Sequence, residues 1–110
     1  MTHEIAEACR LHEQGLFCLG QGRYDEAEPL LRRALDIVDA VLGHDHLEAA
    51  GLYLDLGRLE HARGRTAEGE ALARWGLRIR ERELRPDHPD VAEARHAVWE
   101  FLRTVSKLTA

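Results

Sequence analysis

Apolar residues recur along this chain at the spacing of helices. Two stretches step by three and four positions: Leu30, Leu31, Ala34, Leu35 and Val38 in the first, and Leu52, Leu56 and Leu59 in the second. This period is typical of amphipathic helices, and glycine or proline breaks separate five such stretches. The sequence therefore predicts an all-α chain of five helices, over about 3–20, 24–42, 46–63, 66–84 and 88–107.

The chain also repeats itself with a period of 42 residues. When the sequence is shifted by 42, residues 22–46 fall on residues 64–88 with 11 identities in 25 positions. Such a period indicates stacked helical hairpins, because one hairpin cannot bury its apolar face alone. We expect a first repeat over about 4–45, a second over about 46–87, and a capping helix over about 88–107.

Small residues recur where paired helices would approach closely. They are Gly15, Ala27 and Ala34 in the first repeat, and Gly57, Gly69 and Gly76 in the second. Trp99 takes the place of Gly15 and Gly57 in the last predicted helix, which fits a terminal helix with room on that side. Asp45 and Asp87 stand where helix caps belong, and Pro89 suits a first helical turn.

The segment LGQGRYDEAEPLLRRALDIVDAVLGHDH, residues 19–46, resembles a tetratricopeptide repeat. Gly15, Ala27, Leu31 and Ala34 have the spacing of the small and bulky signature positions of that repeat. The 42-residue period and the DHPDVA of residues 87–92 are similar to the kinesin light chain type. The resemblance covers nearly the whole chain. It implies one domain over 1–110, an α-α hairpin solenoid that binds protein, is not an enzyme and needs no cofactor.

The resemblance further implies a concave face lined by the first helix of each pair. The residues implied are Cys9, His12, Leu16 and Leu19, then Gly51, Leu54, Arg58 and His61, then Glu93, His96, Glu100 and Arg103; of these we expect all but Cys9, Gly51 and Glu93 to contact the partner. Within each set the residues step by three or four positions, so they share one side of a helix. We expect a protein or peptide partner there, whose acids or carbonyls would meet forked arginine donors.

A second interpretation stays open at this point. The apolar set on the first helix could be core or an oligomer contact, because apolar helix stripes more often pack than bind ligands. Two and a half repeats also fall short of the roughly three that repeat proteins need for stability. The alternative is therefore a homo-oligomeric scaffold with no dedicated peptide ligand.

Charge and composition narrow the partner classes. The net charge is −5, the isoelectric point is near 5.8 and aromatic residues make up 5%, which argues against nucleic acid. No run of 18 apolar residues exists, so we expect no membrane partner. Charged side chains fill the first turns in place of an apolar signal core, and Cys9 and Cys18 are too far apart on one helix to bridge. We therefore expect reduced thiols and a cytoplasmic location.

Histidines in the turns between repeats raise the question of a metal site. His44 and His46 form an H-x-H, and His88 recurs one repeat later. Zinc needs three or four converging ligands, whereas Asp-His at each turn between repeats is interpreted as capping chemistry. We expect no metal site. The motifs of zinc proteases, dinucleotide-binding loops and nucleophile elbows are absent, so we expect no catalytic residues.

Overall fold

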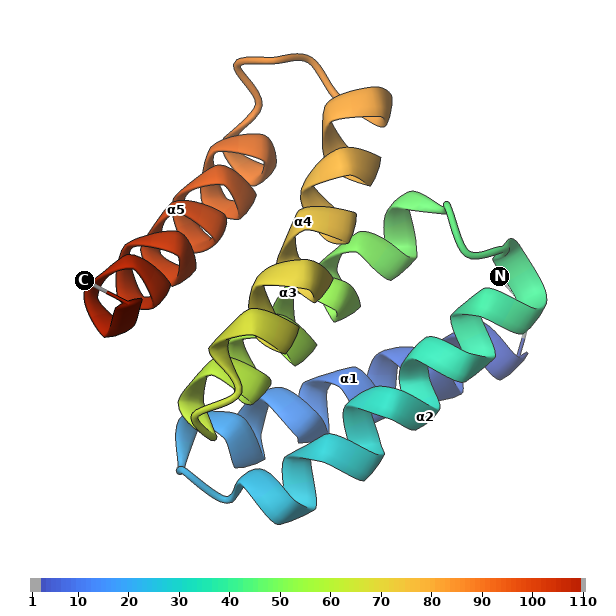
Figure 1. Cartoon of the computed structure of the whole chain (residues 1–110). Helices are drawn as coiled ribbons and strands as arrows, with labels where there is room; N and C mark the ends of the chain where they lie inside the picture. The colour runs from blue at the N-terminus through green and yellow to red at the C-terminus, as the bar shows by residue number, and fades with distance from the viewer. Residues whose placement is uncertain (1–2, 110) are drawn as a thin grey trace.

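The computed structural model describes residues 3–109, with side chains described as far as residue 106. Within that range the chain forms five helices (Figure 1), and each lies within two residues of its predicted bounds. They are α1 His3–Gly20, α2 Tyr24–Leu42, α3 Leu47–Ala62, α4 Thr66–Glu83 and α5 Pro89–Thr109. The all-α prediction is confirmed.

The helices pack as two hairpins with a fifth helix beside the second (Figure 1). α1 packs against α2 and α3 against α4, while α2 meets α3 and α4 meets α5 across the junctions. α1 also touches α3, and α3 touches α5. The side of the stack formed by α1, α3 and α5 is called the first-helix face below, and the side formed by α2 and α4, which Figure 1 shows in front, the second-helix face.

The two hairpin turns have the same backbone conformation, 42 residues apart. Gly22 has a φ of 74° and Gly64 a φ of 87°, a region that glycine enters without a steric penalty. The following residue then donates back to the last turn of the helix: Arg23 N–H to Cys18 O at 2.9 Å, and Arg65 N–H to Glu60 O at 2.8 Å. This bond satisfies carbonyls that a helix end leaves free.

Histidines, and not the predicted aspartates, cap the helices that follow the turns between hairpins. His46 Nδ1 accepts the Glu48 N–H at 3.0 Å, and His88 Nδ1 accepts the Asp90 N–H at 3.0 Å. The prediction for Asp45 and Asp87 is wrong, because each lies one residue too far from the helix for this bond. Pro89 does begin α5, as predicted.

The core confirms the predicted close approaches of small residues. A Cβ added to Gly57 would lie 2.7 Å from Gly69 O, and one added to Gly76 would lie 2.7 Å from Ala50 O. The backbones of α3 and α4 therefore touch directly. Leucines 31, 52, 56 and 59 fill the space between the two hairpins. Trp99, on the outer side of α5, is 55% exposed, as expected for a last helix.

Candidate partner-binding surfaces

The three predicted residues of α1 lie at the surface to different degrees. Leu16 is 40% exposed. His12 is partly buried beside α3, and Leu19 is partly buried against the core. Leu16 is therefore the apolar side chain of this set that a partner can reach most readily.

All three residues of the set on α3 lie beside α5, but Leu54 is buried in the core, whereas Arg58 and His61 are partly exposed. Leu54 is only 1% exposed and packs with Ala94, Ala97 and Phe101 of α5. The prediction that Leu54 contacts a partner is wrong in this structure, because α5 packs against this side of α3 and covers the residue. His61 stacks on Phe101 with ring centroids 4.6 Å apart, and its Nδ1 lies 3.2 Å from Thr66 Oγ1.

Arg58 is the centre of a chain of ion pairs that crosses the first-helix face. Its Nη1 donates to Asp55 at 3.1 Å and its Nη2 lies 3.4 Å from Glu93 of α5. On one side, His12 Nε2 donates to Asp55 at 2.7 Å. On the other, Arg80 Nη1 of α4 donates to Glu93 at 2.9 Å. Side chains from four helices are thus joined in one sequence of contacts.

The pKa of Glu93 reflects the balance of burial and charge in this series of ion pairs. Burial alone would raise the pKa of Glu93, but the hydrogen bond from Arg80 and the charge of Arg58 outweigh that effect and hold the pKa below its ordinary value. The carboxylate is therefore ionised at neutral pH and fixes both guanidinium groups. An incoming partner must share these arginines with the acids that already hold them.

Asp55 and Arg80 were missed by reasoning from the sequence. Asp55 has Glu13 and Ala97 as its counterparts in the other repeats, so the 42-residue period gives no signal for it. Arg80 belongs to a second helix, yet its guanidinium reaches Glu93 and the backbone oxygen of Asp90 at 2.9 Å. Only the packing of α4 against α5 brings it to this face.

The set on α5 is the most open part of the face. The side chain of His96 is 73% exposed and lies 3.9 Å from Glu100. Arg103 donates to Glu100 at 2.7 Å, and its guanidinium carbon lies 4.8 Å from the centre of the Trp99 ring. These side chains pair with one another along the helix, so they form an exposed strip of mixed charge.

A shallow pocket of about 270 Å³ opens between these helices at the start of α3. It is lined by His12, Leu47, Glu48, Gly51, Arg80 and Asp90. The Arg80 side chain is 11% exposed, and a Cβ on Gly51 would lie 3.5 Å from its Nη2, in ordinary van der Waals contact. The pocket therefore joins the α1 and α5 parts of the predicted surface.

The histidines considered for metal binding have other partners. His44 Nδ1 lies 2.9 Å from Asp39 Oδ2, and His46 Nδ1 is occupied by its capping bond. In the described part of the chain, no group of three or more His, Cys, Asp or Glu side chains is arranged to hold a metal ion. Nor does any helix among those residues have the length and apolar character to cross a membrane.

Stacked hairpins that recur after 42 residues, with the same turn at each and a fifth helix in the first-helix position, define a helical-hairpin repeat protein. Residues 6–82 match the family model described as "Tetratricopeptide repeat", and the chain belongs to this family. The match is to the family as a whole, and the kinesin light chain type stays a prediction. No curated protein matches the chain. Proteins of this family generally serve as protein-interaction modules.

Proposed function

We propose that the chain is a non-catalytic module that binds a segment of a partner protein across the first-helix face. The observation that supports this most is the continuity of the face. Side chains of α1, α3 and α5, two repeats apart in sequence, are joined by the contacts of His12, Asp55, Arg58 and Glu93. A segment lying across these helices would meet all three at once.

The proposed contacts divide by chemistry. Leu16 and Leu19 offer apolar surface at the α1 end, whereas His96, Glu100 and Arg103 offer mixed charge at the α5 end. Between them, Arg58, whose side chain is 39% exposed, can direct N–H groups at a backbone carbonyl or a carboxylate, while Arg80, 11% exposed, holds Glu93 in place behind it. His12 and His61 would border this middle part.

Site-specific photocrosslinking in the source organism tests the proposal. Benzoylphenylalanine in place of His96 is expected to capture one defined partner from cell extract. The same group in place of Ala71, an exposed residue of α4 on the other side, is the matched control. Capture from position 71 and none from position 96 would place the partner on the second-helix face and contradict the proposal.

The partner captured in this way allows a quantitative test at the ion-pair chain. Arg58→Gln removes the charge that Asp55 and Glu93 share, and we expect about tenfold weaker binding, the usual loss for one charged hydrogen bond. Arg85→Gln removes an exposed arginine that pairs with Asp87 in the turn before α5, and the affinity of this variant should stay unchanged. Equal affinities for both variants would remove Arg58 from the binding surface.

A homo-oligomeric scaffold is the second candidate, and one observation favours it. Phe17 is 62% exposed and borders a recess of about 460 Å³ lined also by Cys18 and Leu30. Its counterparts, Leu59 and Phe101, are buried by the preceding hairpin. Sedimentation equilibrium decides between the candidates: a dimer that Phe17→Ser dissociates favours the scaffold, and a monomer favours the adaptor.

A cytoplasmic location, supported by two free cysteines, belongs to either proposal.

A further inference from the structure

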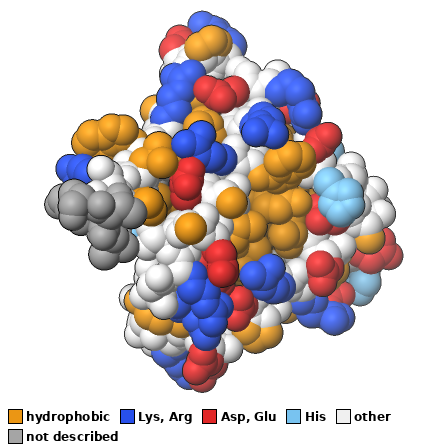
Figure 2. Space-filling model, viewed as in Figure 1, with side chains coloured by type: hydrophobic (Ala, Val, Ile, Leu, Met, Phe, Trp, Pro, Cys, Tyr) orange, Lys and Arg blue, Asp and Glu red, His pale blue; other side chains and the backbone are white. Residues whose placement is uncertain are grey.

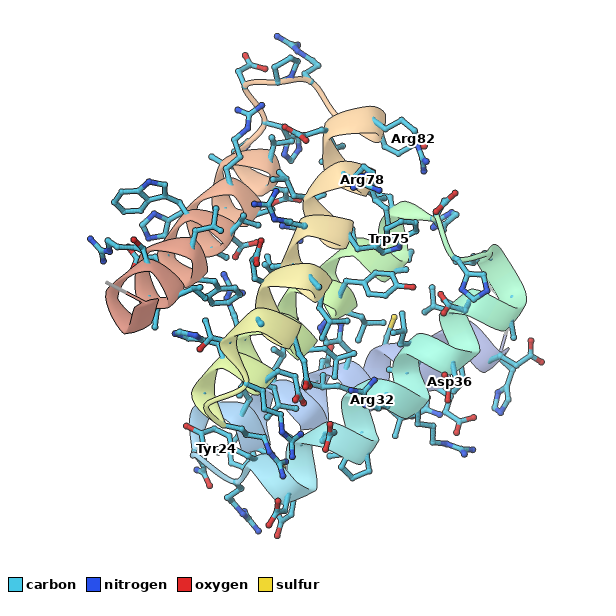
Figure 3. The ribbon with its side chains drawn as sticks, viewed as in Figure 1. Tyr24, Arg32, Asp36, Trp75, Arg78 and Arg82 are labelled. Atoms are coloured by element: carbon cyan, nitrogen blue, oxygen red, sulfur yellow. The ribbon has the colours of Figure 1, made fainter. Side chains whose placement is uncertain are left out.

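The second-helix face carries an apolar patch that the family's first-helix surface does not include. Figure 2 shows hydrophobic side chains gathered between α4 and α2, with arginine or lysine side chains at opposite edges. We call this the α2–α4 patch and define it by Tyr53, Leu72 and Trp75, which are all partly buried. In Figure 3, Trp75 and Arg78 of α4 lie across this area from Arg32 and Asp36 of α2.

The centre of the patch is a rigid aromatic pair. The rings of Tyr53 and Trp75 meet edge to face, with centroids 6.3 Å apart and planes at 76°. Burial, together with the nearby charge of Asp39, raises the pKa of Tyr53, so its hydroxyl stays protonated and uncharged. Rigid aromatic surface of this kind loses little conformational entropy when another side chain covers it.

Arg78 differs from the other arginines of α4 because, among the side chains that the structure describes, no carboxylate pairs with it. Arg74 pairs with Glu70, Arg80 with Glu93, and Arg82 with Asp45 and Glu83. Arg78 instead lies over the Trp75 ring, its guanidinium carbon 5.5 Å from the centroid. A guanidinium over the face of a tryptophan ring is attracted to it, and its N–H groups can still donate to a planar acceptor such as a carboxylate.

The acids near the patch do not neutralise this donor. Asp39 Oδ2 lies 2.9 Å from His44, Asp45 pairs with Arg82, and Asp36 lies with Arg32 on the α2 side, across the patch from Arg78. Arg32 itself shares its charge with Glu28 at 3.4 Å. The unpaired positive charge therefore lies on the α4 edge, directly beside the aromatic pair.

We propose that the α2–α4 patch binds an acidic segment of a partner protein that carries a large apolar side chain next to a carboxylate. The apolar side chain covers Tyr53 and Trp75, and the carboxylate takes two N–H groups of Arg78 while that guanidinium stays stacked. Binding of this kind needs no change in the ion pairs of the first-helix face. The inference is therefore independent of the proposed function.

A titration followed by tryptophan fluorescence tests it. The variant Trp99→Phe leaves Trp75 as the single tryptophan reporter. The probe is acetyl-Ser-Asp-Leu-Phe-Asp-Ser-amide, and its matched control has lysine in place of both aspartates. We expect the acidic probe to shift the Trp75 emission with saturation below about 1 mM, a weak but specific affinity, and the lysine probe to cause no shift.

Three variants in the same background locate the binding. Arg78→Gln should weaken the acidic probe about tenfold, because one charged, forked contact is lost. Arg85→Gln and Arg58→Gln should leave its affinity unchanged. The proposal is overturned if the lysine probe binds equally well, if no saturation is reached, or if Arg78→Gln binds like its parent. An emission shift produced by raising the protein concentration alone would identify a second copy as the occupant and would also overturn it.

Discussion

At the scale of single residues, this fold depends on a few positions where a side chain has no room. Gly57 and Gly69 bring the backbones of α3 and α4 into contact, and Gly76 does the same against Ala50. Gly20, by contrast, is a helical glycine with nothing within 4 Å of an added Cβ. The same substitution should therefore have opposite effects at the two kinds of site.

The substitution Gly57→Ala should destabilise the protein by about 1–3 kcal/mol, because its Cβ meets a backbone oxygen that cannot move aside. Gly20→Ala should be neutral or stabilise by up to about 1 kcal/mol, since alanine restricts the unfolded chain. Urea unfolding measures both. Equal free energies of unfolding for Gly57→Ala and the parent would show that the helices are not in close contact there.

Two acids that are held by arginines, the buried Glu60 and the half-exposed Glu93, make stability depend on pH. Burial alone would raise the pKa of Glu60, but the hydrogen bond from Arg65 outweighs it, and Glu93 is affected in the same way by Arg80 and Arg58. Both pKa values are lower in the folded state than the ordinary value of 4.5. The unfolded chain therefore takes up these protons first as the solution is acidified.

The contribution of these two acids to the free energy of unfolding should be constant from neutrality to about pH 5 and then fall as the pH drops through and below 4.5. Urea unfolding at a series of pH values measures this. Glu93→Gln should flatten the acid limb, whereas Glu13→Gln, an exposed glutamate of α1, should leave it as steep as in the parent. Identical acid limbs in all three proteins would contradict the assignment.

At the scale of helices, the 42-residue period predicted the elements well and the contacts between them less well. Helix bounds follow from apolar spacing and glycine turns, which are local. The helical period places Leu54 correctly on the first-helix side of α3. It does not reveal that α5 packs over this position and buries it. Trp75 and Arg78 carried no signal, because their counterparts are Arg33 and Asp36. Residues that depart from the repeat are those that its period cannot predict.

The recurrence of an Asp-His pair before α3 and α5 does indicate helix capping, but the histidine and not the aspartate of each pair accepts the capping bond. His46→Ala and His88→Ala should each lower the free energy of unfolding by about 0.5–1 kcal/mol, the lower part of the range for a lost cap. His96→Ala, at an exposed side chain 3.9 Å from Glu100, should change it by less than about 0.5 kcal/mol. Thermal unfolding of the three variants checks this, and equal midpoints would contradict the capping role.

At the scale of the whole molecule, the two faces of the stack offer a partner different chemistry. The first-helix face is a chain of internal ion pairs with exposed leucine at one end and an open charged strip at the other. The second-helix face has one aromatic patch and one unpaired arginine. The fold positions both by stacking hairpins in register, so substitutions on one face should leave the other unaffected.

The central claim is that the first-helix face binds the partner protein. Isothermal titration of the photocrosslinked partner against Leu16→Asp and Ala71→Asp tests it most directly, because both residues are exposed and lie on opposite faces. Leu16→Asp should weaken binding by about tenfold or more, since an apolar contact is replaced by a charge, while Ala71→Asp should bind like the parent. Full affinity in Leu16→Asp together with loss in Ala71→Asp would contradict it.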